Sequence, residues 1–423
     1  MSPNPISPRA ASIAAIAALT AALASAQQPN EDWRVRLDFP SKASALDSEG
    51  NLVLDGGGFN TVKLAPDGKV LWDRPFDIPG GHTVPSWVVV DAQDNVVRGG
   101  YQESIGGGYL AVKYDPDGNL LWYSTFGIGV GSEARRVAVD ELGDVYLFGE
   151  TWGGATGTEP TGHDFLTVKF SADGAFRWAR IAHGTNSDEP SSLAVRGGRV
   201  VVTGHTGSRW LTVCYDYAGN ELWTRLYEHG IVGGNDVVVG PAGQVVVCGW
   251  GTTDGGFPYV GTVVQYDAKG NEDWRVYHNG PFGPVDNFVR LAIADDGAVV
   301  AVGWASDAGA YEDWSVLKIS PAGEELWSQH HAGIAGWMEY ATAVALGPAG
   351  EVYVGGKSGP SCTGIGLEGV LRKYSADGEH LWTYHLRCGD FPLNVHVARK
   401  GVLMIGSSIQ AFRVQERFAK GRR

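Results

Sequence analysis

Two strand patterns alternate along the chain and together predict an all-β protein. The first is a hairpin whose strands are almost continuously apolar and β-branched, as in 137–139 and 145–148 around a turn at Gly143. Such runs are typical of strands that are covered on both faces. This hairpin occurs eight times, at 45–54, 88–98, 137–148, 193–203, 237–248, 291–302, 344–354 and 395–405.

A second hairpin follows the first seven times, and it is marked by a turn glycine with a tryptophan four residues later. In Asp115-Pro116-Asp117-Gly118, proline presets φ and glycine supplies the left-handed position of the turn. The spacing of 45 to 56 residues fits one four-stranded blade per repeat. The pairs are Gly68/Trp72, Gly118/Trp122, Gly174/Trp178, Gly219/Trp223, Gly270/Trp274, Gly323/Trp327 and Gly378/Trp382.

Eight inner hairpins and seven outer ones leave the last blade incomplete. Residues 411–414 supply its third strand, and 33–37 match the outermost-strand pattern of 223–227. We therefore predict an eight-bladed β-propeller of four-stranded antiparallel blades, closed by the N-terminal strand, with a seven-bladed ring as the alternative. Closure removes exposed sheet edges. An open solenoid or two sandwiches would not explain why one strand of the last blade comes from the other end of the chain.

The seven tryptophans are expected to be structural. On an outer strand, a large ring can fill the wedge between radiating blades and pack against the backbone of the next blade.

The repeat unit resembles those of bacterial β-propeller repeat proteins, in which segments such as Val168-Lys169-Phe170-Ser171-Ala172-Asp173-Gly174 are followed by a residue like Trp178. The resemblance covers 27–423. It extends more distantly to the tryptophan-docking propellers of quinoprotein (PQQ-like) proteins, which share the glycine and the tryptophan four residues on. The resemblance implies the propeller fold and, as an alternative activity, quinone-dependent redox chemistry.

The N-terminal 26 residues are predicted to be a signal peptide. Arg9 precedes an apolar run at 10–23, which is followed by Ala24-Ser25-Ala26, a small-residue cleavage site. The run is too short to span a bilayer, so we expect cleavage near Ala26, a single propeller domain over 27–423 and a secreted or periplasmic location.

The four cysteines fall into two groups. Cys362 and Cys388 lie in irregular segments flanking one strand pair, and in an exported chain we expect them to form a disulfide. Cys214 and Cys248 lie within strand patterns, where buried free thiols are expected.

Charge and motifs narrow the classes of function. A net charge of −14 argues against nucleic acid and anionic membranes as partners. We find no nucleophile elbow, phosphate loop, zinc-protease helix or dinucleotide fingerprint. The sequence therefore does not decide whether the protein is an enzyme, and a non-enzymatic role is favoured.

We expect a binding or scaffold module that engages a protein or glycan partner through its loop-rich face. The loops concerned are 74–87, 100–108, 151–164, 251–259 and 305–313. The opposite face, with its short hairpin turns, should be a plain scaffold surface.

Polar residues recur four or five positions before the innermost strands, at Glu133, Glu189, Asp286 with Asn287, Glu339 and Asp390. One interpretation is an acidic ring at the channel mouth that binds a cation or a polyol. It underlies the alternative function, a quinoprotein-type or metal-assisted oxidoreductase using calcium or PQQ. The second interpretation is that each carboxylate accepts backbone N–H groups where a strand begins. We favour this structural interpretation because blades 1, 2 and 5 lack the residue. No cofactor is therefore predicted.

Two further residue types recur. Histidines follow the outer tryptophans at offsets of three to six residues, so we expect solvated loop side chains that do not share a face. They are His183, His229, His278, His330, His331 and His385. Third-strand lysines should be solvated or form ion pairs between blades. They are Lys63, Lys113, Lys169, Lys318 and Lys373, with Cys214 and Gln265 in their place in two blades.

Overall fold

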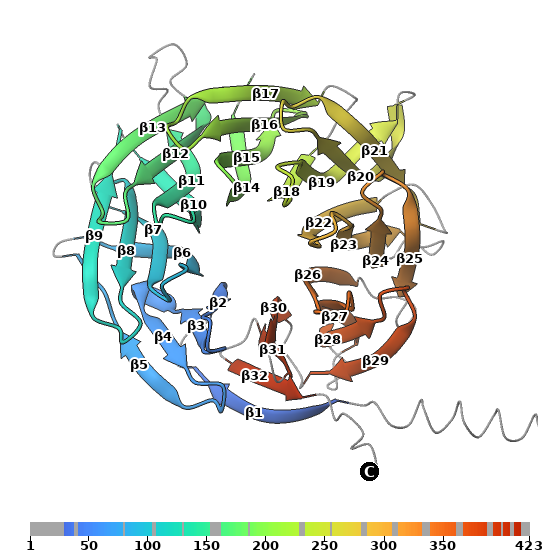
Figure 1. The fold of residues 1–423 in the computed structure, drawn as a ribbon, viewed down its shortest axis with the longest axis horizontal. Helices are drawn as coiled ribbons and strands as arrows, with labels where there is room; N and C mark the ends of the chain where they lie inside the picture. Colours follow the sequence, from blue (N-terminus) through green and yellow to red (C-terminus); the bar gives the residue numbers. More distant parts are fainter. Residues whose placement is uncertain are drawn as a thin grey trace, which may run out of the picture.

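The computed structural model shows a ring of radiating β-sheets around a central axis (Figure 1). The residues described are 29–37, 41–78, 81–103, 107–128, 131–152, 162–184, 187–227, 233–253, 256–280, 286–306, 312–331, 339–360, 367–386, 392–398, 401–406 and 410–415. Within them the strands form eight four-stranded sheets, and the neighbouring strands of each sheet pair antiparallel. These sheets are the eight predicted blades.

Seven blades use four consecutive strands each, running from the centre of the ring outward. Blades 1 to 4 consist of β2 (Ser44–Leu46), β3 (Leu52–Asp55), β4 (Thr61–Leu64) and β5 (Val70–Arg74); β6 (Thr83–Val90), β7 (Val96–Gln102), β8 (Tyr109–Tyr114) and β9 (Leu120–Phe126); β10 (Ser132–Val139), β11 (Val145–Trp152), β12 (His163–Phe170) and β13 (Phe176–Ala182); and β14 (Asp188–Arg196), β15 (Arg199–Thr206), β16 (Arg209–Asp216) and β17 (Glu221–Tyr227). Blades 5 to 7 consist of β18 (Gly233–Val239), β19 (Val245–Thr253), β20 (Gly256–Tyr266) and β21 (Glu272–His278); β22 (Asp286–Ile293), β23 (Val299–Ser306), β24 (Glu312–Ile319) and β25 (Glu325–His331); and β26 (Tyr340–Leu346), β27 (Val352–Pro360), β28 (Leu367–Tyr374) and β29 (His380–His385). A short 3-10 helix, η1 (Gly57–Phe59), lies between β3 and β4.

The eighth blade joins the two ends of the chain. It contains β30 (Pro392–Ala398), β31 (Gly401–Gly406), β32 (Gln410–Gln415) and, as its outermost strand, β1 (Asn30–Arg36). β1 pairs antiparallel with β32, with Trp33 opposite Arg413. The predicted closure by the N-terminal strand is therefore confirmed.

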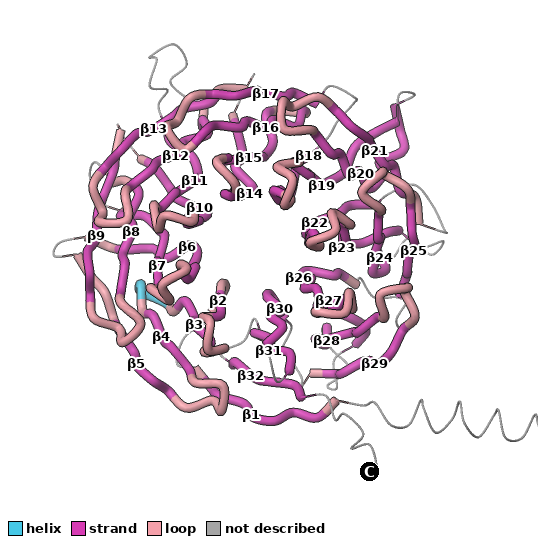
Figure 2. Tube along the Cα trace, in the orientation of Figure 1, coloured by secondary structure: helices cyan, strands magenta, loops and turns pink. Residues whose placement is uncertain are grey.

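The hydrophobic core is divided among the spaces between blades. The inner strands are apolar on both faces because a neighbouring blade covers each face. Val97 of blade 2, for example, packs in one cluster with Val137 and Leu147 of blade 3. In blades 1 to 7, short turns join the first strand to the second and the third strand to the fourth (Figure 2). No helix of the described ranges is long and apolar enough to cross a membrane.

Several sequence predictions concern residues outside the described ranges. These are the signal peptide, Asp390, His229 and both members of the predicted disulfide, Cys362 and Cys388. Cys214 and Cys248 are buried free thiols, as predicted. Burial raises the pKa of Cys214 to about 12.

Candidate functional site

Each outer tryptophan that follows a turn glycine lies on an outermost strand, and most contact the turn of the next blade. A Cβ built on Gly118 would lie 2.8 Å from the Trp72 ring, so only glycine lets the indole approach the turn this closely. Trp33 of β1 makes the same contact across the ring closure. The tryptophan and glycine pairs are Trp33 with Gly68, Trp72 with Gly118, Trp122 with Gly174, Trp178 with Gly219, Trp223 with Gly270, Trp274 with Gly323 and Trp327 with Gly378. Trp382 is 3% exposed and contacts the ring of Tyr353.

A single carbonyl of the next blade receives both the indole N–H and a cation from the third strand. The Pro116 carbonyl accepts from Trp72 Nε1 at 2.9 Å and from Lys63 Nζ at 3.1 Å. The shared acceptor holds two strands of one blade against one turn of the next. The same arrangement occurs at Tyr217 with Trp178 and Lys169, at Ala376 with Trp327 and Lys318, and at Pro66 with Trp33 and Arg413.

Most of these lysines also pair with a carboxylate in the inner turn of their own blade. Lys63 and Lys113 are each 3% exposed, which contradicts the prediction that these lysines are solvated. Their ion pairs also lie within one blade, whereas the sequence suggested ion pairs between blades. The pairs are Lys63–Asp47 at 2.9 Å, Lys113–Asp91 at 2.8 Å, Lys169–Asp144 at 2.8 Å and Lys373–Glu351 at 3.3 Å. Each lysine therefore links the inner and outer hairpins of its blade.

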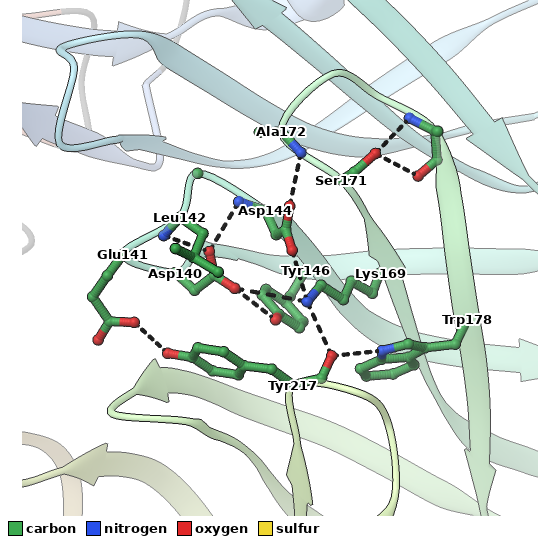
Figure 3. A network of polar contacts seen from close by, with 12 residues as sticks. Asp140, Glu141, Leu142, Asp144, Tyr146, Lys169, Ser171, Ala172, Trp178 and Tyr217 are labelled. Atoms are coloured by element: carbon green, nitrogen blue, oxygen red, sulfur yellow. Dashed lines mark hydrogen bonds and ion pairs between the residues drawn. The ribbon is translucent and has the colours of Figure 1, made fainter.

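Figure 3 shows this network between blades 3 and 4. Lys169 lies between the carboxylates of Asp140 and Asp144 and reaches the carbonyl of Tyr217. Asp140 also accepts the Tyr146 hydroxyl at 2.8 Å, and burial is the main cause of the raised pKa of Tyr146. Every charge in this buried group has a partner, as low-dielectric surroundings require.

The predicted acidic residues do not form one ring. Glu133 pairs in register with Glu150, and Glu189 pairs with His205. Asn287 has the same register position in blade 6, but Asp286 comes one residue earlier, opposite Ala305. Consecutive strand residues point to opposite faces. Asp286, and Glu339 at the equivalent position before β26, therefore face away from the side of Glu133 and Glu189.

Asp286 and Glu339 are buried at strand starts and accept backbone N–H groups. Asp286 is 1% exposed and accepts the N–H of Gly280, and burial raises its pKa to about 7. Glu339 accepts the Ser358 hydroxyl and the Gly359 N–H, both at 3.0 Å.

Glu133 is half-buried, and its pKa is raised by burial and then by the nearby charge of Glu150. In blade 6, Asn287 accepts from Asn235 of blade 5 at 2.6 Å. Within the described ranges, no group of three or more His, Cys, Asp or Glu side chains could hold a metal ion.

Two histidines meet between blades 5 and 6, contrary to the prediction that their side chains are solvated and do not share a face. His278 is 6% exposed, and its Nε2 lies 3.4 Å from Nε2 of His330. Burial lowers the pKa of both imidazoles, that of His330 to about 4. The other described histidines include His183, which is half-exposed and pairs with Asp164 at 2.8 Å.

Charged and polar side chains of the innermost strands connect neighbouring blades. Ser192 donates to Asp236 of the next blade at 2.6 Å, and Asp236 also accepts the Leu291 N–H of blade 6 at 2.9 Å. The Arg136 guanidinium lies 4.4 Å from the centre of the Trp87 ring. Burial, and then the charge of Arg290, lower the pKa of Arg136 to about 10. These side chains share one position, directly after the register shift of their innermost strand, but sequence reasoning missed them because the residue type at that position changes from blade to blade.

Comparison with known proteins identifies the fold. No protein-family model matches the chain, and no curated protein matches its sequence. Solved structures similar to it include BamB from Moraxella catarrhalis, at 14% identity and a TM-score of 0.57, with 92% of this chain and 100% of that chain covered. The C-terminal WD40 domain of Sif2 matches at 12% identity and a TM-score of 0.58, covering 92% and 98%. Sqt1 from Chaetomium thermophilum matches at 12% identity and a TM-score of 0.60, covering 93% and 100%. At these identities the likeness establishes a β-propeller fold.

Proposed function

We propose that this protein is an exported binding or scaffold propeller that engages a protein or glycan partner through its loop-rich face. The observation that carries the proposal is the difference between the two faces of the ring. The connections from second to third strands vary from Gly207-Ser208 between β15 and β16 to the run 153–162 between β11 and β12. Most of the described hairpin turns on the other face share one hydrogen-bond pattern, such as Gly118 N–H to the Asp115 carbonyl and Gly143 N–H to that of Asp140.

The physical argument concerns rigidity. Binding residues are often carried by variable loops that a rigid scaffold holds in place. The tryptophan and lysine contacts between blades supply such a scaffold, because each fixes an outer turn to the preceding blade. Location outside the cytoplasm follows from the predicted signal peptide and belongs to the same proposal.

The test is a loop replacement. In the variant, residues 153–162 are replaced by Gly-Ser, copying the short connection of blade 4, and Asp67→Ala on the turn face is the matched control. Each protein is used to capture partners from envelope extracts of the source cells and is applied to a glycan array. We expect both to retain the melting temperature of the parent chain, while the loop variant alone loses a partner.

Two outcomes would contradict the proposal. One is identical binding by all three proteins. The other is stabilisation of the parent chain by pyrroloquinoline quinone with calcium beyond calcium alone, which would support the oxidoreductase alternative.

A further inference from the structure

Blade 6 departs from the lysine and carboxylate pattern of the other blades. Lys318 has the same position as Lys63 and Lys113, facing the outer tryptophan of its own blade in register. The inner turn of blade 6, however, carries Ala294 where blades 1 to 3 carry an aspartate, and Ala298 where blade 7 carries Glu351.

Lys318 keeps its bond to the next blade but lacks the carboxylate. Its Nζ donates to the Ala376 carbonyl at 2.9 Å and lies 6.0 Å from the centre of the Trp327 ring. Across the described ranges it forms no ion pair, whereas the equivalent lysines of blades 1, 2, 3 and 7 each form one. The lysine is half-buried, so water compensates its charge only in part.

A cavity of about 650 Å³ opens where the carboxylate is missing. It lies at the inner turns of blades 6, 7 and 8, on the face where the sequence predicts a plain scaffold surface. Lys318 forms part of its wall, and the rest is mostly apolar, with Ile293, Val300, Leu346 and Val397. The volume falls in the range of small-molecule sites, which combine apolar walls with a few polar groups.

We propose that this cavity binds a small monocarboxylate with an apolar body. Its carboxylate pairs with Lys318 in the way that Asp91 pairs with Lys113, and its carbon chain covers the apolar wall. Asp295 and Asp296 are exposed and also line the cavity. Their charges oppose a second anionic group, so a dicarboxylate binds less well. This site is independent of the loop-rich face and of the function proposed for it.

The probes are octanoate, its uncharged analogue 1-octanol and the dicarboxylate azelate, titrated calorimetrically into the full chain. We expect octanoate to bind at least tenfold more tightly than either of the others. Lys318→Gln should abolish the preference for octanoate over octanol. Lys113→Gln is the matched control, because that lysine already has its own carboxylate; it should lower the melting temperature and leave octanoate affinity unchanged.

Ala294→Asp gives the sharpest test, because it restores the residue found in blades 1 to 3. The new carboxylate should pair with Lys318, raise the melting temperature and weaken octanoate binding at least tenfold. Failure of octanoate to bind the parent chain would overturn the proposal, and so would equal affinity of the parent and Ala294→Asp. Neither result bears on partner binding by the loop-rich face.

Discussion

Replacing Trp178 by alanine removes the side chain that docks blade 3 on blade 4. The indole is 6% exposed, packs near the rings of Tyr146 and Tyr215, and donates to the Tyr217 carbonyl at 3.1 Å. Truncation of a buried tryptophan costs about 3–5 kcal/mol, because burial is lost and a cavity remains. Each blade is held by its own strand ladder, so the gap between blades collapses little. We therefore expect a loss of about 4 kcal/mol in the free energy of unfolding.

Trp178→Phe separates the hydrogen bond from the packing. The Tyr217 carbonyl keeps Lys169 Nζ as a donor at 3.0 Å, so the acceptor is not left without a partner. The hydrogen-bond part of the cost should therefore stay near the net value of about 1 kcal/mol.

Gly219→Ala tests the contact from the other side. Gly219 has φ of +82°, and a Cβ there would lie 2.8 Å from the Trp178 ring. In the parent chain we expect backbone strain of about 1–2 kcal/mol together with an overpacking cost of about 1–3 kcal/mol. In the Trp178→Ala background only the backbone strain should remain.

The assay is a double-mutant cycle measured by urea unfolding, followed by far-ultraviolet circular dichroism, with scanning calorimetry as a second measurement. Residues in contact should show a coupling energy of about 1–3 kcal/mol, whereas independent sites add. Additive effects of Trp178→Ala and Gly219→Ala would refute the docking argument, as would a cost below about 1 kcal/mol for Trp178→Ala alone.

Three further predictions concern charge, thiols and closure. The raised pKa of Asp286, about 7, against about 4 in an unfolded chain, means that stability falls as pH rises from about 4 to about 7. Asp286→Asn should reduce the fall in the urea midpoint between pH 5 and pH 8, and a fall as large as that of the parent chain would contradict this prediction. Under non-reducing conditions, Ellman's reagent should find no reactive thiol in the native protein and two in urea, Cys214 and Cys248. Four thiols in urea would show that Cys362 and Cys388 are not paired. Deleting β1 should leave an open ring of low solubility, and a soluble deletant with the parent melting temperature would contradict closure by this strand.

The fold could be predicted from the sequence because its determinants are local and repeat, the inner hairpin eight times and the glycine and tryptophan pair seven times. A turn glycine and a tryptophan four residues later fix one hairpin, and an apolar run without alternation identifies a strand covered on both faces. The incomplete last blade then places β1 beside β32. The partner of Lys63 could not be found this way, because Asp47 lies in the inner hairpin and the contact depends on the registers of β2 with β3 and of β3 with β4.

The contact between His278 and His330 was not predicted because the alternation of side chains between the two faces of a strand was considered within single blades only. In a ring of stacked sheets, the face of one blade that carries its tryptophan meets the opposite face of the next. A residue an even number of positions after the tryptophan of one blade therefore faces a residue an odd number of positions after the tryptophan of the next blade. His278 lies four residues after Trp274, and His330 lies three after Trp327. This difference in parity, which seemed to separate the rings, is what brings their Nε2 atoms to 3.4 Å.

The same offsets recur one blade earlier. Tyr227, four residues after Trp223, has its hydroxyl 3.0 Å from that of Tyr277, three residues after Trp274. Because the two pairs share these offsets, the contact is a property of the stacked blades rather than of histidine chemistry. Matching an even offset in one repeat with an odd offset in the next would therefore have located the histidine pair and the tyrosine pair from the sequence. This matching extends strand periodicity from a single sheet to the interface between two sheets.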